Sequence, residues 1–242
     1  MERFETVADV ATATGGDALA CWAAQRLESG GAAYGYGDAV GVVAPDLFRR
    51  DRLVVRGPAH HAVELTRQIR TALPVTFRLL GTAELVHTIV REIPELPEAH
   101  EFGWMETRTL AASSRRAVWL TAEELTEAET LARRVHPETW AVPGESPDHR
   151  WAGARHQDGQ LVALAADAWS GGGVGFISGV LTDGLVRGMG YAQDTTAFVT
   201  HDLVRRYGRA ALMVDLDNHV AVRLYRRLGF AGETVAAARL FR

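Results

Sequence analysis

The sequence contains no lysine, and arginine supplies all 26 of its basic residues. Acetylation of the protein's own lysine side chains is therefore excluded. Cys21 is the only cysteine, so neither an intrachain disulfide nor a cysteine-rich zinc site can form. The net charge of −4 provides no overall basic field of the kind that favours nucleic acid as a partner.

Long apolar runs are also missing from the sequence. No stretch approaches the roughly 18 apolar residues that a membrane-spanning helix needs. The first residues, Met1–Glu5, lack the basic start and apolar core of a signal peptide. We therefore expect a cytoplasmic protein that does not associate with membranes. At 242 residues, 47% of them hydrophobic, the chain is long enough for one large domain or two small ones.

The clearest chemical signal lies between residues 177 and 207. Ile177–Thr182 is an apolar run that predicts a buried strand, and the apolar spacing over Ala192–Tyr207 predicts a helix. The connection Arg187–Ala192 holds two glycines and an alanine, which let a ligand approach the backbone. The first-turn amides of the helix lack helical partners, so this arrangement favours phosphate or pyrophosphate, and Arg187 adds a positive charge.

Three interpretations of this loop remain open at this point. A tight turn that binds nothing is common between a strand and a helix. A dinucleotide-binding fold requires Gly-x-Gly-x-x-Gly, but Gln193 stands at the third position and only about 50 residues remain for further βαβ units. The third interpretation, a coenzyme A site, depends on the sequence that follows.

The following segment is more specific. Ala210–Leu216 predicts a second strand, and Asn218 precedes a predicted helix, His219–Leu228, which Gly229-Phe230 ends. With this pattern, roughly residues 115–242 resemble the GCN5-related N-acetyltransferases (GNAT). The residues that carry the resemblance are Val180, Thr182, Arg187, Gly190, Ala192, Asn218, Ala221, Leu224, Tyr225, Gly229 and Phe230.

The resemblance implies an α/β (α+β) fold with a mixed, mostly antiparallel GNAT sheet flanked by helices. It also implies acetyl-CoA as cosubstrate, no metal, and direct attack by a primary amine of a small molecule on the acetyl group. The residues that would bind the coenzyme are Val180, Leu181, Thr182, Arg187, Gly188, Met189, Gly190, Tyr191, Ala192 and Asn218.

By the same resemblance, Tyr225 would be the general acid that protonates the leaving thiolate. The reference pKa of a phenol, about 10, lies above that of a thiol, about 8.5, so a phenol still carries its proton at neutral pH when the thiolate departs. The alternative for Tyr225 is a packing role as a buried aromatic residue on an amphipathic helix. The general base is not assigned, because Asp167, Asp183 and a chain of water molecules all remain open.

The resemblance leaves other questions open as well. A non-catalytic module that only binds and senses acyl-CoA remains an alternative to an enzyme. The identity of the acceptor amine and the formation of a homodimer also stay open.

The first hundred residues repeat part of this element order. Asp38–Ala44 and Arg52–Arg56 predict strands, and a helix, a strand and a helix follow them. In the loop after the second strand, Pro58 removes one backbone donor and no further small residues follow in register. We therefore expect a degenerate GNAT-like domain over residues 1–105 and a catalytic GNAT domain over 106–242, linked within residues 93–114.

Several smaller features complete the expectations. His60 and His61 lack a carboxylate or cysteine at ligand spacing, so we expect them to be solvated rather than to bind a metal. Thr121 and Glu124 form a capping-box pattern at the start of a helix. Trp140, in an irregular segment, either lines the acceptor pocket or anchors a surface loop. Since only one strand follows the last helix, the acceptor side is either open or completed by the N-terminal half.

Overall fold

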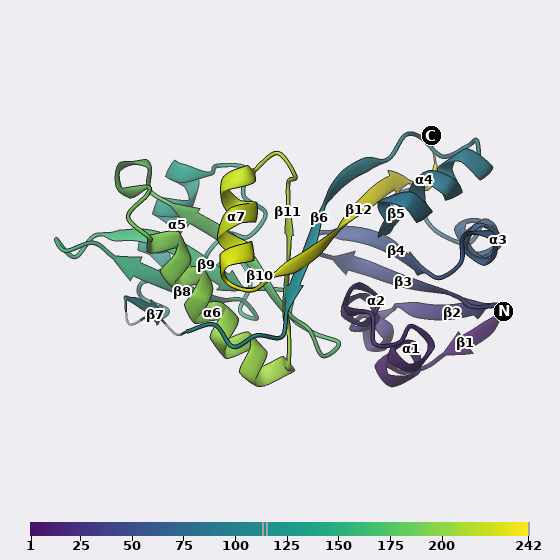
Figure 1. The fold of residues 1–242 in the computed structure, drawn as a ribbon, viewed down its shortest axis with the longest axis horizontal. Coiled ribbons are helices and arrows are strands. Elements are labelled where there is room, and N and C mark those ends of the chain that lie inside the picture. The colour runs from purple at the N-terminus through teal and green to yellow at the C-terminus, as the bar shows by residue number, and fades with distance from the viewer. Residues whose placement is uncertain (113, 115, 242) are drawn as a thin grey trace. The chain divides into compact units, whose positions relative to one another are not determined.

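The computed structural model describes residues 1–112, 114 and 116–241, so Ser113, which falls in the expected link, lies outside the described residues. The chain divides into two compact units, which are coloured along the sequence in Figure 1. The first comprises Met1–Trp104, Val214–Asn218 and Gly232–Arg242, and the second comprises Met105–Met213 and His219–Ala231. The C-terminal strand, which the sequence analysis placed in the catalytic domain, therefore groups with the N-terminal unit.

The first unit is built on a sheet with the strand order β1-β2-β3-β4-β5-β12. Neighbouring strands are antiparallel except β4 and β5, which are parallel because helix α3 connects them. The strands are β1 (Glu2–Phe4), β2 (Ala32–Tyr36), β3 (Ala39–Leu47), β4 (Arg50–Arg56), β5 (Arg78–Thr82) and β12 (Ala231–Arg239). The helices are α1 (Val7–Ala13), α2 (Ala18–Ala24), the 3-10 helix η1 (Leu27–Ser29), α3 (Ala59–Arg70) and α4 (Ala83–Glu92).

The core of the first unit lies between its sheet and two helices. Helices α3 and α4 pack on the sheet face that carries Leu53, Val55 and Leu79. Helix α2 contacts β3 and β4. All seven residues of α2 are buried, including Cys21, which places the only thiol inside the protein.

The second unit contains strands in the order β11-β10-β9-β8-β7, antiparallel from β7 to β10 and parallel between β10 and β11. The strands are β7 (Ala117–Trp119), β8 (Arg150–Arg155), β9 (Leu161–Asp167), β10 (Gly175–Thr182) and β11 (Ala210–Val214). The helices are α5 (Leu125–Val135), the 3-10 helix η2 (Gly184–Val186), α6 (Tyr191–Tyr207) and α7 (His219–Arg227). This mixed, mostly antiparallel sheet with flanking helices confirms the predicted fold class. None of the described helices is both long enough and apolar enough to cross a bilayer.

Two strands pass from one unit to the other along the chain. Strand β6 (His100–Thr107) lies in the segment expected to link the halves, and the boundary between the units, at Trp104 and Met105, falls within this strand. Its Trp104 is buried and packs against Trp22 in the first unit, whereas Met105 onward belongs to the second. Strand β12 begins in the second unit and pairs with β5 in the first. The residues of β6 and of β12 are therefore each divided between the two units.

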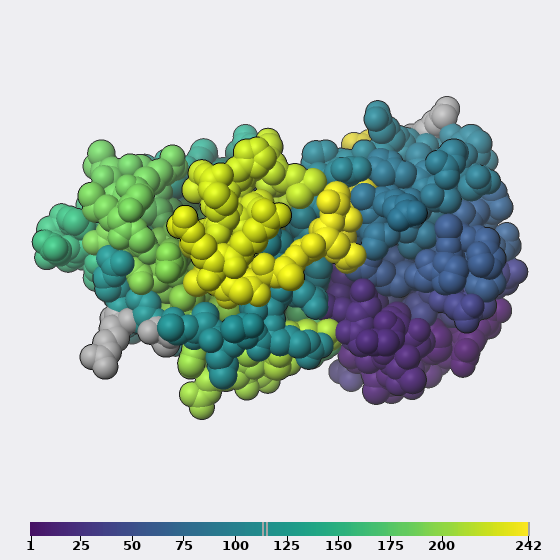
Figure 2. Space-filling model, in the orientation of Figure 1, coloured from purple at the N-terminus to yellow at the C-terminus, as the bar shows by residue number. Residues whose placement is uncertain are grey.

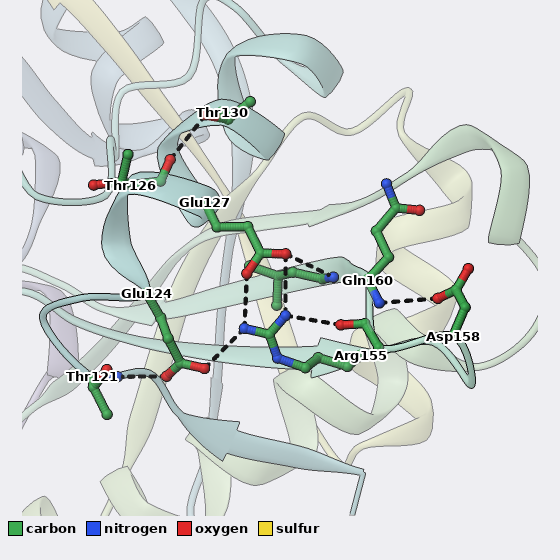
Figure 3. Close-up of polar contacts among 10 residues, drawn as sticks. Thr121, Glu124, Thr126, Glu127, Thr130, Arg155, Asp158 and Gln160 are labelled. Atoms are coloured by element: carbon green, nitrogen blue, oxygen red, sulfur yellow. Dashed lines mark hydrogen bonds and ion pairs between the residues drawn. The ribbon is translucent and has the colours of Figure 1, made fainter.

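A polar network holds helix α5 to the β8–β9 hairpin (Figure 3). Arg155 donates to Glu124 at 2.9 Å and to both carboxylate oxygens of Glu127, at 3.1 and 2.8 Å. The Thr121 N–H donates to Glu124 at 2.9 Å, which is the glutamate half of the predicted capping box. The Thr121 amide and then Arg155 lower the pKa of Glu124, and the hydrogen bond from Arg155 lowers the pKa of Glu127.

Candidate active site

Strands β10 and β11 separate after a short stretch of pairing. Their parallel register covers only Gly175 with Ala210 and Phe176 with Ala211, although β10 continues to Thr182. In a regular parallel ladder the facing backbone N–H and C=O groups would continue to pair. Within the described residues, the edge of β10 that faces β11 therefore has no strand partner beyond Phe176. Its backbone groups are available to a ligand.

A β-bulge bends β10 where the two strands separate. The register with β9 shifts between Ser178 and Leu181, and Gly179 in between has a φ of +61°. A Cβ atom at Gly179 would stand 2.5 Å from Cη2 of Trp151, which is buried. Both the backbone angle and the close approach of the indole therefore require glycine here. Leu181 packs into the same core cluster as Trp151, so only its backbone can serve a ligand.

The end of β10 offers an unpaired polar group. Val180 and Thr182 are half-buried. The hydroxyl oxygen of Thr182 is inaccessible to solvent and has no hydrogen-bond partner among the described residues. Leaving a buried hydroxyl unpaired costs about 1–3 kcal/mol. A ligand lying along this edge could provide the missing partner.

Asp183 anchors the loop that follows β10. One carboxylate oxygen accepts the N–H of Leu185 at 3.0 Å, and the other accepts Arg134 at 2.5 Å. The other candidate base, Asp167, is buried, accepts Arg206 at 2.8 Å and accepts the hydroxyl of Ser170. Both carboxylates therefore have structural partners, and neither is an unengaged base.

The loop delivers the chain to the N-terminus of α6. Gly190 occupies the cap position with a φ of +87°, and no side chain caps the helix there. The first-turn amides of this 17-residue helix thus remain available to an anion. Arg187, Gly188 and Met189 are exposed, and Ala192 is half-buried.

The side chain of Tyr191 is not available to a ligand. It is buried, and its hydroxyl lies 2.9 Å from Nδ1 of His156. Tyr191 also packs with Val186, which ties the loop to the hairpin strands β8 and β9. Of the predicted loop residues, Tyr191 can therefore offer only its backbone.

Arg116, which sequence reasoning missed, lies at the same helix N-terminus. Its Nη2 is 2.5 Å from the carboxylate of Asp194, and its guanidinium lies 4.9 Å from the centre of the Tyr191 ring. A Cβ atom at Gly190 would stand 3.1 Å from Arg116 Nη2. By neutralising Asp194, Arg116 preserves the positive potential of the helix N-terminus. No local motif could have revealed this residue, because it is distant in the sequence.

Tyr225 is the one buried residue among the described residues of α7, a helix seen in yellow at the surface of the second unit in Figure 2. Its ring packs against Phe230 at 6.0 Å between centroids. Burial raises the pKa of Tyr225 to about 12, so its hydroxyl is protonated at physiological pH. The raised pKa also makes full proton transfer to a thiolate harder.

Asn218 lies in the turn before α7, where its backbone N–H donates to the carbonyl of Asp215 at 3.0 Å. Residues 214–218 group with the first unit. The assignment of Asn218 to the pantetheine arm therefore stays a prediction.

The irregular segment before β8 lies close to the bulge. A Cβ atom at Gly179 would stand 3.3 Å from Cβ of Ala141, and Ala141 packs with Trp151. The neighbouring Trp140 is 37% exposed. The role of Trp140 as a wall of the acceptor pocket stays a prediction.

The described residues contain no cluster of three potential metal ligands. In the first unit, Nδ1 of His61 accepts the N–H of Asp38 at 3.0 Å, and the His60 ring lies 4.0 Å from that of His61. His61 therefore has a backbone hydrogen-bond partner.

Comparisons with known proteins agree with this geometry. Residues 152–238 match the family model described as FR47-like protein. A GCN5-related N-acetyltransferase from Kribbella flavida is 22% identical, with a TM-score of 0.58 over 85% of this chain and 88% of that one. One from Sphaerobacter thermophilus is 16% identical, with a TM-score of 0.53 over 84% and 81%. A GNAT-family acetyltransferase from Colwellia psychrerythraea is 12% identical, with a TM-score of 0.54 over 100% and 99%.

No curated protein matches the sequence. At these identities the solved structures establish the fold. The resemblance drawn from the sequence is therefore confirmed: the chain has the fold of the GCN5-related N-acetyltransferases and carries an FR47-like region at residues 152–238.

Proposed function

We propose that the protein is an acetyl-CoA-dependent N-acetyltransferase that acts on a primary amine of a small molecule. The observation that carries the proposal is the unpaired edge of β10, which leads through a short loop to the uncapped N-terminus of α6. An extended arm with amide groups fits the first feature, and a pyrophosphate fits the second. Acetyl-CoA combines both.

The residues at the site would divide the work of binding. The backbone of Val180, Leu181 and Thr182 would align the pantetheine arm, and Asn218 would hold it further along. The loop and the first-turn amides of α6 would bind the pyrophosphate. Arg187 forms no ion pair among the described residues, so it could bind a phosphate oxygen.

The chemistry follows from what aminolysis of a thioester requires. Bound acetyl-CoA supplies the activated acetyl group. The uncharged amine attacks the carbonyl carbon, and backbone amides near the bulge stabilise the negative charge that develops on the carbonyl oxygen. Tyr225 donates a proton to the departing sulfur. Since Asp167 and Asp183 are engaged by arginines, the proton of the amine leaves through water in this proposal.

The N-terminal unit lacks the features that define this site, which supports its assignment as a degenerate copy. From Arg52 to Arg56 strand β4 pairs regularly with β3, and the register shift between these two strands lies at the other end of β4, between Ala44 and Leu47 of β3. A Cβ atom at Gly81 on β5 would stand 2.9 Å from the carbonyl oxygen of Val55, so β4 and β5 stay close. Only Gly57 and Pro58 join β4 to α3, which leaves no loop for a pyrophosphate.

A thermal-shift comparison tests the coenzyme assignment. Acetyl-CoA at a hundredfold excess over its Kd should stabilise the protein by about 2.7 kcal/mol, whereas NAD at the same concentration should not. Equal shifts with both ligands would contradict the assignment.

A second candidate function is a module that binds acyl-CoA without turning it over. It is favoured because the carboxylates at the two predicted base positions, Asp167 and Asp183, are both engaged by arginines. Steady-state release of free thiol, measured with a panel of small amines, distinguishes the two. Amine-dependent release supports the enzyme, and coenzyme binding without release by any amine supports the binding module.

A further inference from the structure

A row of arginines crosses the sheet of the first unit. Arg52 on β4 is in register with Arg78 on β5, and Arg78 is in register with Arg239 on β12. Neighbouring strands lie about 4.8 Å apart, so three like charges stand side by side on one face. Because Leu53 and Leu79 face the core, the arginines lie on the opposite face.

This row lacks an acidic ion-pair partner in the part of the chain that the structure describes. Among the described residues, Arg52, Arg78 and Arg239 form no ion pair, although Arg52 is only 6% exposed. Burial, Arg78 and Arg50 lower the pKa of Arg52 to about 10, and burial, Arg50 and Arg239 lower the pKa of Arg78. The neighbouring arginines therefore repel the charged forms of Arg52 and Arg78. A buried charge without compensation is destabilising, so the row favours a bound anion.

Two residues of the row, Arg78 and Arg239, line a cleft of about 460 Å³. The polar and aromatic residues that line it include Arg49, Arg50, Thr76, Arg78, Arg239 and Phe241. Two acidic residues also line the cleft, but each has a partner. Asp46 lies 3.6 Å from Arg26, and Asp51 accepts the N–H of Asp46 at 2.9 Å.

The turn that brings Arg49 to the cleft has an unusual backbone. Asp46, Phe48 and Arg49 have φ angles of 48°, 55° and 55°, in the region that favours glycine. Non-glycine residues persist in such conformations where the surroundings impose them, and they cluster at binding sites.

We propose that this cleft binds a small anion that carries two or more phosphate charges, such as a pyrophosphate or a phosphorylated metabolite. Guanidinium groups bind phosphate oxygens in pairs, and anions with several such oxygens can bridge arginines on adjacent strands. The cleft falls in the size range of small-molecule sites, about 300–1,000 Å³, and exceeds what one phosphate needs. All of its residues belong to the first unit, so the site does not depend on the proposed acetyl transfer.

Calorimetric titration with pyrophosphate at constant ionic strength tests the proposal on the full chain. We expect saturable binding that weakens at least about tenfold in Arg78→Met and in Arg239→Met, each of which removes a guanidinium that lines the cleft but keeps an apolar stem. Arg205→Met is the matched control, because Arg205 is exposed and forms no ion pair among the described residues. This control should bind as the wild type does.

Two further measurements distinguish binding in this cleft from binding at the N-terminus of α6. Gly190→Val, which alters the helix terminus of the candidate active site, should leave pyrophosphate binding intact. Without any anion, Arg52→Met should unfold at the same temperature as the wild type or higher, since it removes an uncompensated buried charge. The proposal is overturned if binding is lost in Gly190→Val but kept in Arg78→Met. It is also overturned if citrate binds as tightly as pyrophosphate, or if Arg52→Met lowers the unfolding temperature.

Discussion

Replacement of Gly179 by alanine should destabilise the second unit through two separable effects. The φ of +61° costs an alanine about 1–2 kcal/mol. The new Cβ would stand 2.5 Å from Trp151 Cη2 and 2.8 Å from its Cζ3, well inside the usual contact distance. Overpacking of this kind costs about 1–3 kcal/mol. Together the two effects predict a loss of about 2–5 kcal/mol in the free energy of unfolding.

Two other glycines in the following loop serve as controls. Gly188 has a φ of +81° but nothing within 4 Å of its ideal Cβ, so Gly188→Ala should show only the backbone cost, about 1–2 kcal/mol. Gly184 has neither a positive φ nor a close neighbour, so Gly184→Ala should be nearly neutral. Urea denaturation monitored by circular dichroism measures all three variants.

A double-mutant cycle then isolates the steric contribution. In a Trp151→Phe background the distal indole atoms are gone, so Gly179→Ala should cost only the backbone contribution. The Trp151 Nε1 has no hydrogen-bond partner among the described residues, so the phenylalanine loses packing but no hydrogen bond. The reasoning is refuted if Gly179→Ala costs the same in both backgrounds, or no more than Gly188→Ala.

The remaining predictions concern catalysis, coenzyme binding, stability at acid pH and deletion of the C-terminal strand. Tyr225→Phe should lower kcat by on the order of 10²–10⁴-fold with acetyl-CoA affinity unchanged, and near-normal turnover would make Tyr225 a packing residue. Since its pKa is about 12, Tyr225 should produce no loss of activity up to about pH 11 in the wild type. Gly190→Val should abolish acetyl-CoA binding in a titration while circular dichroism shows a folded protein, because a side chain would crowd the helix terminus. Arg155→Met should cost about 1 kcal/mol at pH 7 after allowance for solvent screening, and that difference should shrink below about pH 4.5, as the two partner glutamates with lowered pKa values become protonated. Deletion of residues 232–242 should unfold the first unit, which calorimetry would show as the loss of a transition.

Much of the second unit could be predicted from its sequence because its elements are signalled locally. The apolar run of β10, the glycine loop and the Gly229-Phe230 end of α7 are each recognisable within a few consecutive residues. The first unit was harder to predict. Ala32–Tyr36 forms a strand although it is short and contains glycine, and β6 follows a proline-containing segment and carries polar residues.

The features that position the candidate site depend on contacts between distant residues. The bulge at Gly179 is explained by Trp151, which comes from another strand. Arg116 reaches Asp194 across 78 positions of the sequence, so no window of local sequence contains both. The local sequence of β12 does not specify which strand it pairs with. Its pairing with β5 is determined by packing in the folded protein.

The two halves show how local differences separate folds with one element order. Both contain a strand, a helix, a parallel strand and a further helix, in β4 to α4 and in β10 to α7. In the first half β4 pairs regularly with β3 from Arg52 to Arg56, the loop after it is two residues long, and arginines lie near the start of the strand at Arg52. In the second half β10 is bulged, its loop is long, and the unpaired groups lie at the end of the strand at Thr182. In the two proposals the same framework therefore presents ligand-binding groups at opposite ends of the corresponding strand, which is why a ligand of the first half need not be a coenzyme.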